Sequence, residues 1–89
     1  MIKNLLNDIV KLKENNRLND ISLNELKEKY DSSNVDVVCA CVTNNIEKLN
    51  ECINKGDNIS ICNGAVLRYT VEKQYVELSL ILRKHGIEA

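Results

Sequence analysis

Four cysteines carry the most reactive side chains of this sequence. Cys39 and Cys41 lie two residues apart in an apolar run, and Cys52 and Cys62 follow one at a time. Zinc knuckles pair their cysteines as Cys-x-x-Cys, whereas residues two apart on a helix point about 200° away from each other, so this spacing disfavours a shared metal ion. We predict small, buried, reduced thiols that bind no metal. Two disulfides, a metal site or a redox role are the alternatives.

The other side chains show no catalytic constellation. His85 is the only histidine and precedes Gly86, where we expect the last turn of a helix, and a basic group there interacts favourably with the helix dipole. The sequence has neither a Gly-x-Ser-x-Gly turn nor a phosphate-binding glycine-rich loop. Carboxylates such as Glu47 and Glu77 fit solvated helix faces. We therefore predict that the protein is not an enzyme and needs no cofactor.

The composition narrows the class of protein further. The chain has 89 residues, a net charge of −1 and 44% hydrophobic residues, with three Tyr and no Phe, Trp or Pro. The charge and the scarcity of aromatic residues disfavour nucleic-acid binding. The apolar runs are too short to span a membrane, and Asp8 and Lys11 interrupt the place where a signal peptide needs an apolar core. We expect one cytoplasmic, mostly helical domain over residues 1–89.

The first third of the chain predicts two helices. Over residues 2–13, apolar side chains recur at helical spacing, and Lys13 occupies the next position of the same series. A capping-box pattern from Ser22 to Glu25 predicts the start of a second, short helix at about 23–30. These helices would cover the apolar surface of whatever follows them.

The remainder of the chain repeats itself. A shift of 30 residues superposes Gly56 on Gly86, Glu47 on Glu77 and Val37 on Leu67. A period of this length is typical of stacked supersecondary units. The shift also decides residues 35–42, whose composition alone fits a buried strand, because their counterpart at 66–73 has a helical pattern. We predict an all-α fold with about six helices in antiparallel pairs and no sheet.

The residues from Val66 to Gly86 resemble an ankyrin repeat, and residues 40–56 fit the same frame without a gap. The short period is similar to the roughly 30-residue repeats of large DNA viruses and phages. The resemblance implies an N-terminal helical cap at 1–33 and two ankyrin-like repeats at 34–57 and 58–89. Asn44 and Gln74 stand where the family usually has Gly. Ser79 and Arg83 would give the last repeat a polar outer face, as a terminal unit requires.

The resemblance also implies a function, namely protein binding through the loop tips and the exposed side of each first helix. The positions that it marks as partner-binding are Asp31, Ser32, Asn34, Val42, Thr43, Ile61, Cys62, Gly64, Glu72 and Lys73. Among them, Val42, Ile61 and Cys62 are expected to form an exposed apolar centre. For Ile61, packing against the adjacent loop is an equal alternative.

By analogy with viral repeats, we expect the partner to be a host protein and the chain to act as an inhibitor of host defence or regulation, in the host cytoplasm if the chain is viral. One alternative is a nucleic-acid-associated regulator that contacts phosphate through two groups of basic residues. These are Arg17, Lys27 and Lys29, or Arg68, Lys73 and Lys84. The other alternative is a self-assembling structural subunit. A homodimer through the apolar surface next to the first repeat is also open, and no membrane contact is expected.

Overall fold

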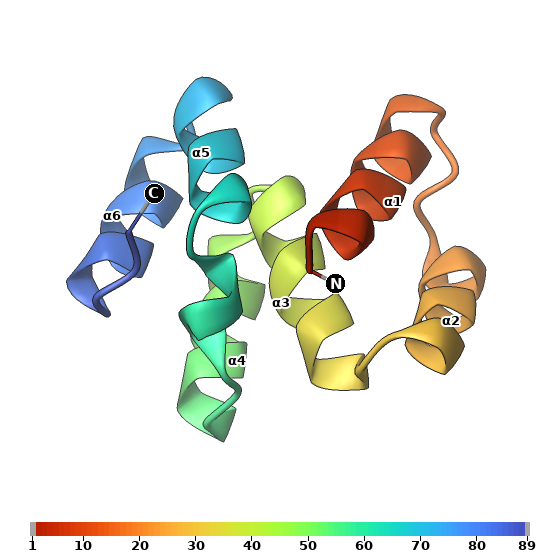
Figure 1. Cartoon of the computed structure of the whole chain (residues 1–89), viewed down its shortest axis with the longest axis horizontal. Helices are drawn as coiled ribbons and strands as arrows, with labels where there is room; N and C mark the ends of the chain where they lie inside the picture. Colours follow the sequence, from red (N-terminus) through yellow and green to blue (C-terminus); the bar gives the residue numbers. More distant parts are fainter. Residues whose placement is uncertain (1, 89) are drawn as a thin grey trace.

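Six α-helices and one 3₁₀ turn make up the part of the chain that the computed structural model describes, residues 2–88, with side chains from Asn4 onward (Figure 1). The elements are α1 (Ile2–Glu14), α2 (Asp20–Lys29), α3 (Ser32–Val42), α4 (Ile46–Lys55), η1 (Ile59–Cys62), α5 (Ala65–Glu72) and α6 (Val76–Lys84). Residues 2–88 contain no strand, and the predicted all-α class is confirmed. None of these helices has both the length and the apolar character needed to cross a membrane.

Side-chain caps fix where three of the α-helices begin: α2, α3 and, through the Asn45 side chain that accepts from the Lys48 amide, α4. The carboxylate of Asp31 accepts a hydrogen bond from the Ser33 amide at 2.9 Å and starts α3. At α2, Asn19 is the cap: its side chain accepts from the Ser22 amide, and the Ser22 hydroxyl accepts from the Asn19 amide. The predicted start at Ser22 was therefore wrong by one turn, because Asn19 is an equally good cap and Ser22 serves as the third residue of its capping box.

The turn inside each helix pair has the same backbone geometry. Asn44, between α3 and α4, and Gln74, between α5 and α6, both adopt positive φ, at 54° and 62°. In both turns the next amide donates to the carbonyl five residues earlier, at 2.9 Å. Asn16 after α1 also has positive φ, 56°, with the same hydrogen bond at 2.8 Å. The first pair thus shares a turn that the 30-residue shift did not reveal.

Helix ends repeat as well. Gly56 closes α4 and Gly86 follows α6, both with φ of 85°, a left-handed conformation that suits glycine. In each case the following amide donates to the carbonyl five residues earlier, at 3.0 and 3.1 Å. The 30-residue period of the sequence is therefore also a period of backbone conformation.

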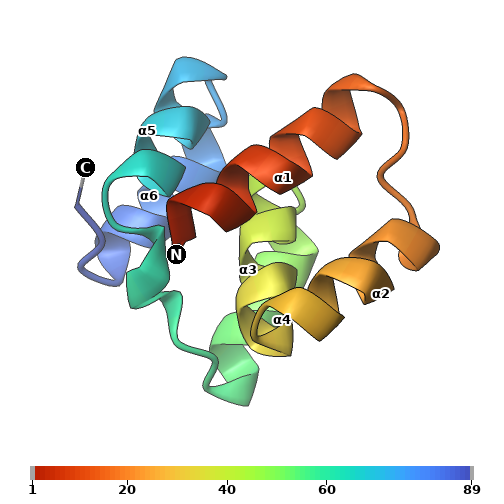
Figure 2. The ribbon, with the colours of Figure 1, turned by 45° about the vertical axis from the view of Figure 1, so that its right-hand side comes forward.

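Helix α3 lies at the centre of the core. Every residue of α3 from Val37 to Val42 is buried, as is Val35, and α1, α2, α4 and α5 all pack against this helix. Helix α1 crosses α3 and also contacts α5 (Figure 2). It buries Leu5, Leu6 and Ile9 there. The N-terminal helices are thus part of the same core as the two later pairs.

Candidate functional site

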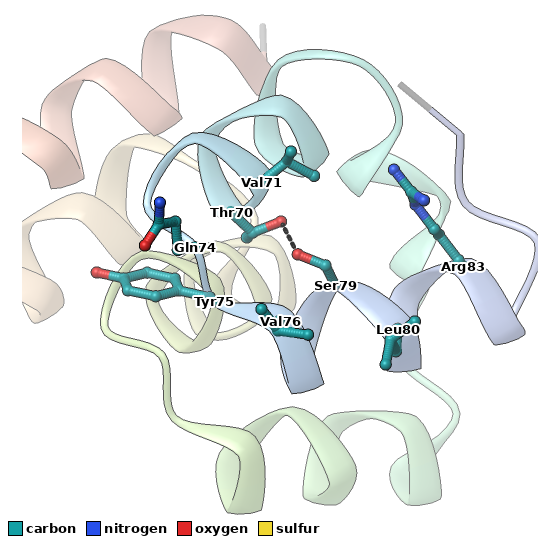
Figure 3. Close-up of a pocket in the computed structure, with 8 residues that line it drawn as sticks. All are labelled: Thr70, Val71, Gln74, Tyr75, Val76, Ser79, Leu80 and Arg83. Carbon is teal, nitrogen blue, oxygen red and sulfur yellow. Dashed lines mark hydrogen bonds between the residues drawn. The ribbon is translucent and has the colours of Figure 1, made fainter.

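The α5–α6 pair lies at one end of the molecule (Figure 1), and it exposes apolar side chains to solvent. Val71, Val76 and Leu80 are 45%, 65% and 60% exposed. They line a shallow groove of about 180 Å³, which we call the α5–α6 groove. Its lining residues are Thr70, Val71, Gln74, Tyr75, Val76, Ser79, Leu80 and Arg83 (Figure 3). Large apolar side chains gathered on one exposed face are typical of an interaction surface.

Helix α6 exposes apolar groups because it is apolar on two sides. Leu78 and Leu82 are fully buried against the rest of the molecule. Val76 and Leu80, one turn apart, point the other way into solvent. A helix that serves only a single core needs one apolar stripe. The second stripe of α6 was therefore the sequence signal that could have revealed this face.

The floor of the groove is polar and internally satisfied. The buried Thr70 hydroxyl donates to the Leu67 carbonyl at 2.7 Å, and it accepts a hydrogen bond from the Ser79 hydroxyl at 2.9 Å (Figure 3). Both hydroxyls have partners, so this floor leaves neither of them for a ligand to satisfy. The specificity of the groove must come from its apolar walls and from Arg83 at its edge.

The prediction of a polar terminal face was wrong. Ser79 is buried in the groove floor, where it contributes almost no surface, and Arg83 stands alone at the edge. Between them the exposed surface is formed by Val76 and Leu80. The prediction failed because it considered only Ser79 and Arg83, the positions that align with Leu49 and Ile53 of the preceding repeat. It did not consider Val76 and Leu80 on the same helix.

One wall of the groove is held by a long-range contact, which we call the Lys13 clamp: Lys13, Val42, Tyr69 and Tyr75. The Lys13 ammonium donates to the Val42 carbonyl at 2.9 Å, to the Tyr75 hydroxyl at 2.7 Å and to the Tyr69 hydroxyl at 3.3 Å. It also lies 5.3 Å and 5.8 Å from the centres of the two tyrosine rings, within cation–π range. The rings meet edge to face at 6.3 Å. The clamp joins α1 to the end of α3 and to the α5–α6 pair.

The electrostatics of the clamp favour a charged lysine. Partial burial acts to lower the pKa of Lys13, but the hydrogen bonds and Coulombic interactions with Tyr75 and Tyr69 together outweigh it and raise this pKa above its usual value. Lys73 approaches the same cluster, with its ammonium 5.7 Å from the Tyr69 ring centre. Two ammonium groups thus lie close to the tyrosine pair that borders the groove.

The exposed apolar centre predicted from Val42, Ile61 and Cys62 was wrong. Val42 and Cys62 are fully buried, and Ile61 is half-buried against the core. Helix α1 covers this end of α3, where the Lys13 ammonium donates to the Val42 carbonyl. The Cys62 sulfur lies 3.9 Å from the Cys41 sulfur inside the core.

The other predicted binding positions do not form one surface. Asp31, Ser32, Thr43, Glu72 and Lys73 are exposed, and Asn34 and Gly64 are half-exposed. Asp31 and Thr43 sit at opposite ends of α3, which has 11 residues and spans about 16 Å. Both have local roles, since Asp31 caps the helix and the Thr43 hydroxyl donates to the Cys39 carbonyl. Thr43 and Lys73 lie near the Lys13 clamp, because Thr43 follows Val42 in the chain and the Lys73 ammonium lies over the Tyr69 ring.

All four cysteines are buried free thiols. Burial raises the pKa of Cys39 and of Cys52, and the hydrogen bond with Cys62, together with burial, raises the pKa of Cys41. Raised pKa values reduce the thiolate population and hence nucleophilic reactivity. Among residues 2–88, no three His, Cys, Asp or Glu side chains gather into a possible metal site.

Compared with known proteins, the chain matches no family model, no curated protein and no solved structure. Function is therefore inferred from the geometry of the α5–α6 groove and its surroundings.

Proposed function

We propose that this chain is a small protein-binding module and that the α5–α6 groove is its contact surface. The observation that carries this proposal is the joint exposure of Val71, Val76 and Leu80 beside a groove at one end of the molecule. An apolar centre with polar residues at its rim is the usual anatomy of a protein interface. Gln74 and Arg83 supply that rim.

The chemistry of the groove defines what a partner must present. Its walls suit aliphatic side chains, and Arg83 at the edge suits a carboxylate or a carbonyl oxygen. The resemblance to viral ankyrin repeats supports a finer proposal, in which such a partner is a host defence or regulatory protein that the chain inhibits. The proposed mechanism is steric, since the groove offers a surface to occupy and no reactive group.

A nucleic-acid role has less support. Two of the basic residues that could contact phosphate already face carboxylates: Lys27 lies 3.1 Å from Asp36 and Lys29 lies 3.9 Å from Asp8. Neutralised side chains contribute little to counterion release, which drives binding to the phosphate backbone.

The test compares two aspartate substitutions at exposed, apolar positions on opposite ends of the molecule. Leu80→Asp alters the α5–α6 groove, and Ile21→Asp alters α2, where Ile21 is 73% exposed. Tagged proteins are used to capture partners from an extract of the cells in which the chain occurs, and circular dichroism verifies that each variant is folded. We expect the parent and Ile21→Asp to retain a partner that Leu80→Asp loses. Equal retention by a folded Leu80→Asp variant would refute the proposal.

A further inference from the structure

The geometry points to a second copy of this chain as an occupant of the α5–α6 groove, with the two α6 helices antiparallel about a twofold axis at Leu80. This inference rests on the proposed function in so far as it uses the same groove. Leu80 lies at the middle of α6 (Val76–Lys84), and its side chain is 60% exposed. A twofold axis places each such residue against its own copy, so an exposed leucine at the centre of the helix supplies an apolar centre for the dimer.

The charges of α6 are complementary to themselves in this arrangement. In an antiparallel pair centred on Leu80, Glu77 comes level with Arg83 of the second copy and is offset by about 1.5 Å along the axis from Lys84 of the second copy. All three side chains are exposed, and none forms an ion pair with another side chain within residues 4–88. The symmetry makes this contact twice, once at each end of the helix pair.

The same charges disfavour the other direction of approach. A parallel pair in register would place Glu77 beside Glu77 and Arg83 beside Arg83 of the second copy. Like charges facing each other across an interface oppose association and exclude that register. The charge pattern therefore selects the antiparallel pairing, in addition to the burial of Leu80 and Val76.

The available area predicts a reversible dimer. The α5–α6 pair lies at one end of the longest axis (Figure 1), and the two shorter dimensions of the molecule are 26 and 23 Å. A rectangle of 26 by 23 Å bounds this end face, so it offers at most about 600 Å² per copy, below the roughly 800 Å² per partner of a standard stable interface. We expect a dissociation constant of about 1–100 µM, which lies at the weak end for such interfaces.

The mass of the protein in solution, measured over a range of concentrations, tests whether the chain dimerises through Leu80. Sedimentation velocity measures the mass of the parent from about 1 to about 300 µM, a range that brackets the expected dissociation constant. We expect the mass to rise with concentration from the monomer value of 10.1 kDa toward twice that value. Leu80→Asp should weaken association at least about 30-fold, the loss typical of a central interface residue. Ile21→Asp at the other end should leave it unchanged.

The charge variants test the register itself. Glu77→Lys alone, or Arg83→Glu with Lys84→Glu, should each weaken self-association. An equimolar mixture of the two variants should recover it, because both contacts become opposite in charge again. Recovery in the mixture also shows that the variants are folded.

A parent that stays monomeric up to about 300 µM, or a dimer unaffected by Leu80→Asp, would overturn the inference. A mixture of the charge variants that remains monomeric while the parent dimerises would refute the antiparallel register. If the parent is monomeric and Leu80→Asp still loses a captured protein, the proposed function stands and only the second copy is wrong. If the parent dimerises through Leu80 but Leu80→Asp still captures the same partner, the dimer stands and the proposed function is wrong.

Discussion

Replacing Lys13 by Met tests whether the Lys13 clamp stabilises the fold. The substitution keeps an apolar stem of similar length and removes the ammonium, which donates three hydrogen bonds to groups on α3, α5 and the turn before α6. We expect the free energy of unfolding to fall, because hydrogen bonds from a charged donor each contribute more than neutral ones.

The magnitude follows from the contacts. One charged hydrogen bond contributes about 1.5–3 kcal/mol, but here three acceptors share one partly exposed ammonium. The Tyr75 hydroxyl lies 3.4 Å from the Val42 carbonyl and can satisfy it when the ammonium is gone. We therefore expect a total loss of about 2 kcal/mol rather than the sum of three bonds. For a domain of this size, that loss lowers Tm by about 8–16 °C.

Lys11→Met is the matched control. Lys11 lies on the same helix, two residues away, and its side chain is exposed. Urea unfolding followed by circular dichroism compares the two variants with the parent, and the midpoint of Lys13→Met should fall by about 2 M for a slope near 1 kcal/mol/M. Adding Tyr75→Phe in a double-mutant cycle should give a coupling energy of about 1 kcal/mol.

The pH dependence of this loss has a definite sign. Because the pKa of Lys13 is raised in the folded state, its stabilising contribution is complete below the usual lysine pKa, about 10.4, and is lost as the pH rises through the raised value. Tyr69 and Tyr75 are the titratable groups that face the ammonium. The difference between parent and Lys13→Met should be constant near neutral pH and decrease only in this alkaline range. Equal stability of Lys13→Met and Lys11→Met at neutral pH would refute the reasoning.

Three further outcomes are expected. The four buried thiols should react slowly with Ellman's reagent at pH 8 in the native protein and rapidly in urea, and four fast-reacting thiols in the folded state would contradict their burial. Asp31→Ala should lower Tm at neutral pH. Hydrogen bonds from Ser33 lower the pKa of the Asp31 carboxyl, so the difference in Tm from the parent should vanish as the pH falls through that lowered value. A difference that persists in acid would point to a cause other than the charged cap. Deleting residues 1–30 removes the buried Leu5, Leu6 and Ile9, each contributing about 1.5–3 kcal/mol, so the fragment should unfold or aggregate; a soluble fragment with an unchanged melting curve would show these helices to be dispensable.

Local pattern was sufficient to predict most of the helices. The 30-residue shift correctly made residues 35–42 a helix, although their composition suited a strand, since the counterpart at 66–73 had no such ambiguity. Helix boundaries were less predictable where two good caps competed, as Asn19 and Ser22 did. Ankyrin family membership stays a prediction.

Burial at the candidate site was not predictable from local pattern. Val42 is the last residue of an apolar helix. Whether its side chain is exposed or buried depends on where α1 crosses α3, which the local sequence does not specify. One clue was present, because Lys13 occupied an apolar position in the stripe of α1, and a polar group there needs a buried partner. Its partners, Tyr69 and Tyr75, lie more than 50 residues away, beyond the reach of any periodicity.

The crossing of α1 over α3 to reach α5 determines which helices unfold together. In a linear array each helix pair meets only its neighbours, so the ends can unfold one pair at a time. Here the contact between Lys13 and Tyr75 spans 62 residues, and the loss of the last pair removes support from the first helix in the same event. Backbone amides of α1 and α5 are then expected to exchange with solvent through one shared opening. We therefore expect α1 and the α5–α6 pair to open together.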